Sequence, residues 1–176
     1  GSLRKDSYNS ALLRTAKTLM PHHMNLDIVD IRNIPLYNGD LEQSNFPESV
    51  ITLREKIRKA QGLIIATPEY NYSIPGVLKN TIDWLSRPPS DPVLSGKPLA
   101  LMGASMGMMG SARAQYHLRQ CCVFLNMHVL NTPELFVSAA HTKFNEQLQL
   151  IDVSTQEMLA KQLEAFHNWV KKLSSK

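Results

Sequence analysis

Two short apolar runs constrain the fold of this chain more than any other feature. Residues 62–66 and 98–104 contain almost only apolar side chains and glycine, and Gly62 and Pro98 stand at their starts. Strands that are covered by helices on both faces of a parallel sheet have such runs, whereas strands with one solvated face alternate apolar and polar residues. The two runs therefore predict buried strands of a parallel sheet.

Segments with helical periodicity surround these runs. Leu12, Ala16 and Leu19 recur at the spacing of one helix face, and Ser7 ahead of them is a favourable N-cap. Further helices are predicted over residues 48–60, 75–85, 112–125 and 155–173, and short strands over residues 26–31, 128–130 and 135–137. The polar stretch that holds Pro35, Asn38, Gly39 and Pro47 is predicted to be a loop. Alternating strands and helices indicate an α/β fold with a doubly wound parallel sheet.

The chain has 176 residues, and we expect one domain over residues 1–176. No run of 18 apolar residues occurs, so no membrane insertion is expected, and the first residues lack the apolar segment of a secretory signal. The two cysteines, Cys121 and Cys122, are adjacent and cannot form a disulfide that links distant parts of the fold. These features together predict a cytoplasmic protein.

The formal net charge of +4 suits an enzyme that handles anions, but it would also suit a weak nucleic-acid binder. The basic residues, among them Arg54, Arg58 and Lys171, are spread along the chain without an aromatic-interleaved stripe or a motif that reads DNA. We therefore expect no nucleic-acid partner.

The first candidate site is the segment of residues 1–9, which runs into the first predicted helix. It offers the hydroxyls of Ser2 and Ser7, the amide of Asn9 and the guanidinium of Arg4 near the positive end of a helix dipole, as a phosphate requires. Neither a Walker loop nor a dinucleotide fingerprint is present. An ordinary helix cap, preceded by a Gly-Ser cloning remnant, is the alternative.

Two further candidate segments follow the apolar runs, at the edge where open α/β sheets bind ligands. Residues 67–76 combine Tyr70 and Tyr72 with polar side chains and flanking prolines, which suits contact with a planar ring; a surface turn is the alternative. In residues 103–110, Gly107 and Gly110 allow the backbone to approach a ligand closely. The methionines of the same segment are equally compatible with a role in the core.

Other chemistries find little support. The six histidines lack the spacing of a helical metal pair, so no metal site is predicted. Cys121 and Cys122 lie within a predicted helix and are expected to be buried rather than redox-active. Ser105 is not part of a hydrolase motif. Without a nucleophile, a metal or a catalytic base, the segments favour a bound cofactor that carries the chemistry, and no catalytic side chain is predicted.

Three blocks of sequence resemble the NADPH-dependent FMN reductase family, and its chromate- and quinone-reducing branch most closely. They are residues 1–9, the long block 67–87 (TPEYNYSIPGVLKNTIDWLSR), and residues 105–120 with their Ser-Met-Gly start. The resemblance implies a flavodoxin-like fold that binds FMN noncovalently. In the family a strand precedes the phosphate loop, so the resemblance also implies that the first strand of the sheet is missing ahead of Gly1.

The resemblance assigns residues to two surfaces. The implied FMN-binding residues are Ser2, Leu3, Arg4, Lys5, Asp6, Ser7, Tyr8, Asn9, Pro68, Glu69, Tyr70, Asn71, Tyr72, Ser105 and Gly107. Among them Ser2, Arg4, Ser7 and Asn9 are the expected side-chain donors to the phosphate, whereas residues 69–72 and Ser105 are expected around the ring. The implied oligomer interface of a homodimer or homotetramer uses Arg113, Tyr116 and Glu134.

The activity implied by the resemblance is ping-pong transfer of hydride from NADPH or NADH, through FMN, to small-molecule acceptors. Quinones, chromate, azo compounds, nitro compounds and free flavin are the implied acceptors. A flavodoxin-type electron carrier without its own turnover is the alternative. Such carriers tend to be acidic, and the charge of +4 therefore favours the enzyme.

Overall fold

The computed structural model describes residues 1–175 and contains a four-stranded sheet in which every pair of strands is parallel. The strands are β1 (Leu63–Ala66), β2 (Pro98–Ala104), β3 (His128–Val129) and β4 (Leu135–Val137). β1 pairs with β2 in the register Leu63↔Leu99. β3 and β4 pair with opposite ends of β2, in the registers Pro98↔His128 and Met102↔Leu135. The predicted parallel α/β fold is confirmed.

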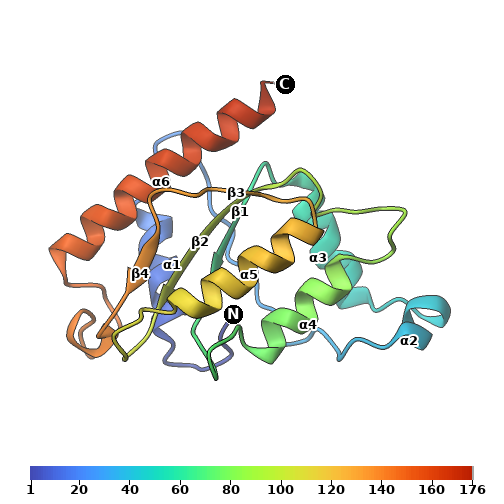
Figure 1. The fold of residues 1–176 in the computed structure, drawn as a ribbon, viewed down its shortest axis with the longest axis horizontal. Coiled ribbons are helices and arrows are strands. Elements are labelled where there is room, and N and C mark those ends of the chain that lie inside the picture. The colour runs from blue at the N-terminus through green and yellow to red at the C-terminus, as the bar shows by residue number, and fades with distance from the viewer. Residues whose placement is uncertain (176) are drawn as a thin grey trace.

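Helices cover both faces of this sheet (Figure 1). One layer consists of α1 (Tyr8–Thr18) and α6 (Val153–Ser174), and the other of α3 (Glu48–Lys59), α4 (Gly76–Leu85) and α5 (Ala112–Phe124). Successive side chains of β2 alternate between the layers: Leu99 and Leu101 pack on the α3–α5 side, whereas Met102 and Ala104 pack on the α1 side. Every residue of β2 is buried, as the apolar run predicted.

Most predicted element ends agree with the structure within one or two residues. Ser7 is the N-cap of α1, and its side chain accepts a hydrogen bond from the Ser10 N–H at 3.3 Å. Pro75 directly precedes α4, where its fixed backbone conformation and missing N–H cost nothing. Periodicity therefore located the helices, and cap residues located their starts.

Two predictions for the segment before α3 are wrong. Residues 26–31 do not form a strand: within residues 1–175 no strand pairs with them, and Ile28 and Val29 are exposed. β-Branched composition alone does not make a strand, because the backbone N–H and C=O groups require a neighbouring strand. The loop predicted around Asn38 contains α2 (Gly39–Ser44), since the Asn38 side chain accepts from the Asp40 N–H at 2.9 Å and caps it.

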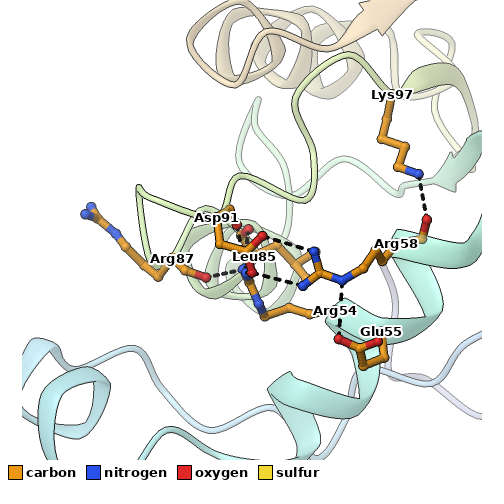
Figure 2. Close-up of polar contacts among 7 residues, drawn as sticks. All are labelled: Arg54, Glu55, Arg58, Leu85, Arg87, Asp91 and Lys97. Atoms are coloured by element: carbon orange, nitrogen blue, oxygen red, sulfur yellow. Dashed lines mark hydrogen bonds and ion pairs between the residues drawn. The ribbon is translucent and has the colours of Figure 1, made fainter.

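A buried arginine fastens the chain that follows α4 onto α3 (Figure 2). The guanidinium of Arg54 donates to the carbonyl oxygens of Leu85, Arg87 and Asp91, and to the Asp91 carboxylate at 2.8 Å. Arg58 donates to both oxygens of the same carboxylate, at 3.0 and 2.9 Å. We call these five residues the Arg54 cluster. The neighbouring guanidiniums, Arg58 foremost, lower the pKa of Asp91 to about 2.

The segments that follow β1, β2 and β4 lie at one end of the sheet, together with residues 1–7, along the lower edge in Figure 1. This is the carboxyl end of parallel strands, the usual ligand-binding edge of doubly wound folds. Within the described residues, no helix has the length and apolar character needed to span a membrane.

Candidate functional site

Hydrogen bonds hold residues 1–9 at the carboxyl edge. The nitrogen of Gly1 donates to the carbonyl oxygen of Ala66 at 2.7 Å, at the end of β1. The buried Asn9 amide accepts from the N–H of Ala104 and donates to its carbonyl oxygen, both at 2.9 Å, at the end of β2. Asn9 thus places the start of α1 beside the sheet, and its polar atoms bond the backbone of β2.

The same segment presents donors that suit an anion. The first-turn N–H groups of α1 have no acceptor within the helix, and the helix dipole makes this end positive. The side chains of Arg4 and Lys5 are exposed beside it. Ser2 accepts from the Arg4 N–H at 3.3 Å, and Ser7 caps α1, so both hydroxyls face this loop. Leu3, Asp6 and Tyr8 complete the segment. Ser2, Arg4 and Lys5 thus lie at the start of α1, whereas the Asn9 amide, expected as a phosphate donor, is buried and bonded to Ala104.

The segment after β1 ends in a tight two-residue turn. Tyr70 and Ser73 exchange backbone hydrogen bonds of 2.9 and 3.0 Å, and Asn71 and Tyr72 between them have φ angles of +50° and +67°. Both central residues are therefore in the left-handed region, as in a type I′ turn, where a tyrosine is rare. We call residues 70–73 the tyrosine turn; its two rings are exposed.

Glu69 lies next to the tyrosine turn, but its carboxylate points to another element. It accepts hydrogen bonds from the backbone N–H of Arg113 at 3.1 Å and of Ala114 at 3.3 Å, and it forms an ion pair with the Arg113 guanidinium. The Arg113 guanidinium in turn lies 3.6 Å from the centroid of the Tyr72 ring. The expectation that Glu69 lines the flavin ring did not include this bond to α5, which no local sequence pattern indicates.

Backbone hydrogen bonds fix the segment that follows β2, residues 105–110. The N–H of Ser105 donates to Val137 at 3.0 Å, its carbonyl accepts from Ala140 at 2.9 Å, and its hydroxyl donates to Gly107 at 3.2 Å. A Cβ atom added at Gly107 would meet nothing within 4 Å, so this backbone borders open space. Ser105 and Gly107 therefore lie just beyond the carboxyl end of β2.

The methionines of this segment are exposed, so the alternative that placed them in the core is wrong. Two glycines of residues 103–110 are tightly packed instead. At Gly110, expected beside a ligand, an added Cβ atom would lie 2.7 Å from the backbone of Phe136. A Cβ atom at Gly103 would lie 1.9 Å from Ser111 Oγ and 2.4 Å from the Thr67 carbonyl oxygen. Glycine at this position allows the segments that follow β1 and β2 to approach each other, which sequence reasoning missed because an isolated glycine in a strand has several explanations.

The residues expected at an oligomer interface separate into two groups within the chain. Tyr116 donates from its hydroxyl to Glu134 at 3.2 Å, and Arg119 lies 3.5 Å from the same carboxylate. Arg113 instead pairs with Glu69. The side chain of Tyr116 is half exposed on the outer face of α5.

Cys121 and Cys122 are both free thiols on α5. Burial raises the pKa of the Cys122 thiol to about 12, so it remains protonated at neutral pH. Its prediction as a small buried hydrophobic residue is confirmed. Within the described part of the chain, no group of three or more histidine, cysteine, aspartate or glutamate side chains has an arrangement suited to a metal ion.

The donor set at this edge fits a phosphorylated aromatic cofactor such as FMN. A cationic helix start suits the phosphate, exposed aromatic rings on a rigid turn suit a planar ring system, and the open backbone at Gly107 leaves room beside them.

Comparisons with known proteins identify the family of the chain. The model of the NADPH-dependent FMN reductase family matches residues 1–142. An NAD(P)H-dependent FMN reductase of Pseudomonas aeruginosa is 53% identical over 173 residues, which cover 98% of this chain and 93% of that protein. A quinone reductase of Escherichia coli is 46% identical over 176 residues, with coverage of 98% and 93%.

Among solved structures, the flavoenzyme FerB of Paracoccus denitrificans, an NAD(P)H:(acceptor) oxidoreductase, is similar with a TM-score of 0.89 and 34% identity. The similarity covers 98% of this chain and 94% of FerB. The chain therefore belongs to the NADPH-dependent FMN reductase family, whose members are NAD(P)H-dependent oxidoreductases with a flavodoxin-like fold and FMN as cofactor.

Proposed function

We propose that this protein is a quinone reductase that takes electrons from NADPH or NADH and works with FMN bound at the carboxyl edge of the sheet. The convergence of residues 1–9, the tyrosine turn and the Ser105 segment at one edge supports this proposal most directly. Relatives named quinone reductase, which are 46% identical, support the choice of acceptor. Small molecules of other kinds, namely chromate, azo compounds, nitro compounds and free flavin, are proposed as further acceptors.

In this proposal each segment has one task. Ser2, Arg4, Lys5 and Ser7 bind the phosphate together with the start of α1, and Leu3, Asp6 and Tyr8 shape the same loop. Asn9 positions that helix through its bonds to Ala104. Pro68, Tyr70, Asn71 and Tyr72 build the wall beside the ring, Glu69 supports this wall through its bonds to α5, and Ser105 and Gly107 border the other side of the ring.

FMN held at this edge would supply the redox chemistry, which is hydride transfer between NAD(P)H and the acceptor. The protein's contribution is orientation: Arg4 supplies a charge-assisted bond to the phosphate, and the N–H groups at the carboxyl edge favour negative charge beside them. The tyrosine turn stabilises a planar ring by stacking. Because the edge beside Gly107 is open, donor and acceptor can occupy the same place in turn, which supports ping-pong kinetics.

The test is the purified protein reconstituted with FMN. We expect a yellow protein that oxidises NADPH faster when benzoquinone is added, with parallel double-reciprocal plots. Arg4→Ala should weaken FMN binding, whereas Lys17→Ala, at the other end of α1, should not. A protein that takes up no FMN would contradict the proposal. An electron carrier would differ in stopped-flow mixing, because NADPH alone would not bleach it.

We also propose a homodimer or homotetramer in the cytoplasm, in which Arg113, Tyr116 and Glu134 lie near the subunit interface. Exposed apolar side chains along α5, including Val123 and Phe124, support an additional contact on this helix. Light scattering of the wild type and of Phe124→Ser tests it: a mass of 19.8 kDa for the wild type would contradict an oligomer.

A further inference from the structure

Glu69 provides the N-terminal cap of a helix that begins far away in the sequence. Ser111, the residue before α5, has a φ angle of +71° and makes no capping bond with its side chain. The Glu69 carboxylate accepts the N–H groups of Arg113 and Ala114 instead, across a separation of 44 and 45 residues. A carboxylate at the positive end of a helix stabilises that helix. Glu69 thereby joins the end of β1 to the start of α5.

The same helix contacts the tyrosine turn at two further points. The guanidinium of Arg113 stacks on the Tyr72 ring, with 3.6 Å to the centroid, while it pairs with Glu69. One helical turn further along, His117 Nδ1 lies 3.0 Å from the hydroxyl of Ser73. We call Glu69, Arg113 and His117, with their contacts to Tyr72 and Ser73, the Glu69 bracket.

The tyrosine turn needs such support. Asparagine tolerates the left-handed region, but a bulky residue such as Tyr72 is disfavoured there by about 1 kcal/mol or more. Tyr72 is two-thirds exposed, so packing against the core does not hold it. The cation–π contact with Arg113 stabilises its ring, and Glu69 pairs with that guanidinium.

We propose that Glu69 and Arg113 are positioning residues for the flavin: they hold the tyrosine turn in its left-handed conformation through Tyr72 and do not bind the cofactor themselves. This inference rests on the proposed FMN site. It predicts that the two side chains act on cofactor affinity as one unit, because Arg113 is placed over Tyr72 only while Glu69 holds it.

The experiment measures the FMN dissociation constant by quenching of flavin fluorescence on apoprotein, and the melting temperature without FMN. Glu69→Gln keeps the shape of the side chain but removes its negative charge. Arg113→Ala removes the guanidinium that stacks on the Tyr72 ring. We expect each to raise the dissociation constant about tenfold, the effect of one charge-assisted contact. The double variant should be no worse than the worse single variant. Asp83→Asn, which breaks the exposed pair with Lys79 on α4, is the control and should leave FMN binding unchanged.

Other variants separate the alternatives. Arg113→Lys keeps the charge but loses the planar fork, so it should restore only part of the affinity. His117→Ala removes an exposed contact without touching the cap of α5, and we expect a rise of about threefold. Additive losses for Glu69→Gln and Arg113→Ala would mean independent contacts with FMN and would overturn the proposal. A lower melting temperature with unchanged FMN affinity would show that Glu69 is only a helix cap, and would overturn it as well.

A second readout does not depend on FMN. Chymotrypsin cleaves after exposed tyrosines, and a loosened turn should be cut at Tyr70 or Tyr72 faster in Glu69→Gln than in the wild type. Equal cleavage rates would overturn the role of the bracket even if FMN binds. If the wild type binds no FMN while the variant is cut faster, the holding role stands and the proposed FMN site fails.

Discussion

The Arg54 cluster and the Glu69 bracket each contain an arginine–carboxylate ion pair, but the buried member is the arginine in one and the carboxylate in the other. In the first, the arginine is buried and the carboxylate is open: the side chains of Arg54 and Asp91 are 6% and 46% exposed. In the second, the carboxylate is buried and the arginine is more open: Glu69 and Arg113 are 7% and 36% exposed. The buried partner decides what each contact does, because it is the member whose polar atoms must be satisfied by protein groups.

Their surroundings differ accordingly. Arg54 donates to backbone carbonyl groups at the end of α4 and in the chain that follows it. The cluster thereby joins this segment to α3 (Figure 2). Glu69 leaves the guanidinium of Arg113 free to stack on an exposed ring at the carboxyl edge. The comparison teaches that a buried arginine uses its donors within the protein, whereas an arginine paired with a buried carboxylate keeps one face available for a further contact.

The largest expected effect comes from Arg54→Met. It leaves the carbonyl oxygens of Leu85, Arg87 and Asp91 without their donor, so the free energy of unfolding should fall by about 3 kcal/mol in urea denaturation. FMN affinity of the folded fraction should not change. Lys59→Met on the same helix is the control. A loss confined to FMN binding would remove the distinction between the two clusters.

A smaller effect on stability is expected for Glu69→Gln. The amide oxygen still accepts from α5, so only the charge-assisted part of the bond is lost, and the free energy of unfolding should fall by about 1.5 kcal/mol. Urea denaturation of apoprotein measures it beside Arg54→Met. A loss larger than that of Arg54→Met would mean that the bracket, and not the Arg54 cluster, is the main fastening.

Acid should weaken the Arg54 cluster. The pKa of Asp91 is lowered to about 2 in the folded protein from its usual 3.8, so between these values the unfolded chain binds the proton that the folded chain does not. The contribution of the Asp91 ion pairs to the free energy of unfolding is therefore fully present above pH 4 and is lost as the pH falls toward 2. In Asp91→Asn, stability should therefore depend less on pH in this window, as followed by circular dichroism. An unchanged acid profile would contradict the pairing.

The smallest effect is expected for Arg58→Ala. Its guanidinium and the Asp91 carboxylate are both largely exposed, and salt screens such pairs. The variant should raise the acid midpoint slightly at low salt. The difference from the wild type should shrink in 1 M NaCl, where the Debye length falls to about 3 Å. A difference that persists in high salt would indicate a contribution from burial rather than from exposed charge.

Periodic features were predictable from the sequence because they arise from neighbours along the chain. The apolar run at residues 98–104 is β2, the spacing of Leu12 and Ala16 marks the buried face of α1, and Ser7 caps it. The segments with Tyr70 and Ser105 were found because a ligand edge follows from strand direction. The strand expected over residues 26–31 failed, because pairing depends on a neighbour that composition does not report.

The sequence by itself determined the parallel α/β fold, the segments that meet at its carboxyl edge and, through the blocks that include the tyrosine turn, the family. Only the tertiary structure decided which charged side chains act at that edge. Arg54 and Arg113 are both arginines on amphipathic helices, and nothing within either helix tells them apart. Their partners, Asp91 and Glu69, lie 37 and 44 residues away, and a contact across such a distance exists only once the chain has folded.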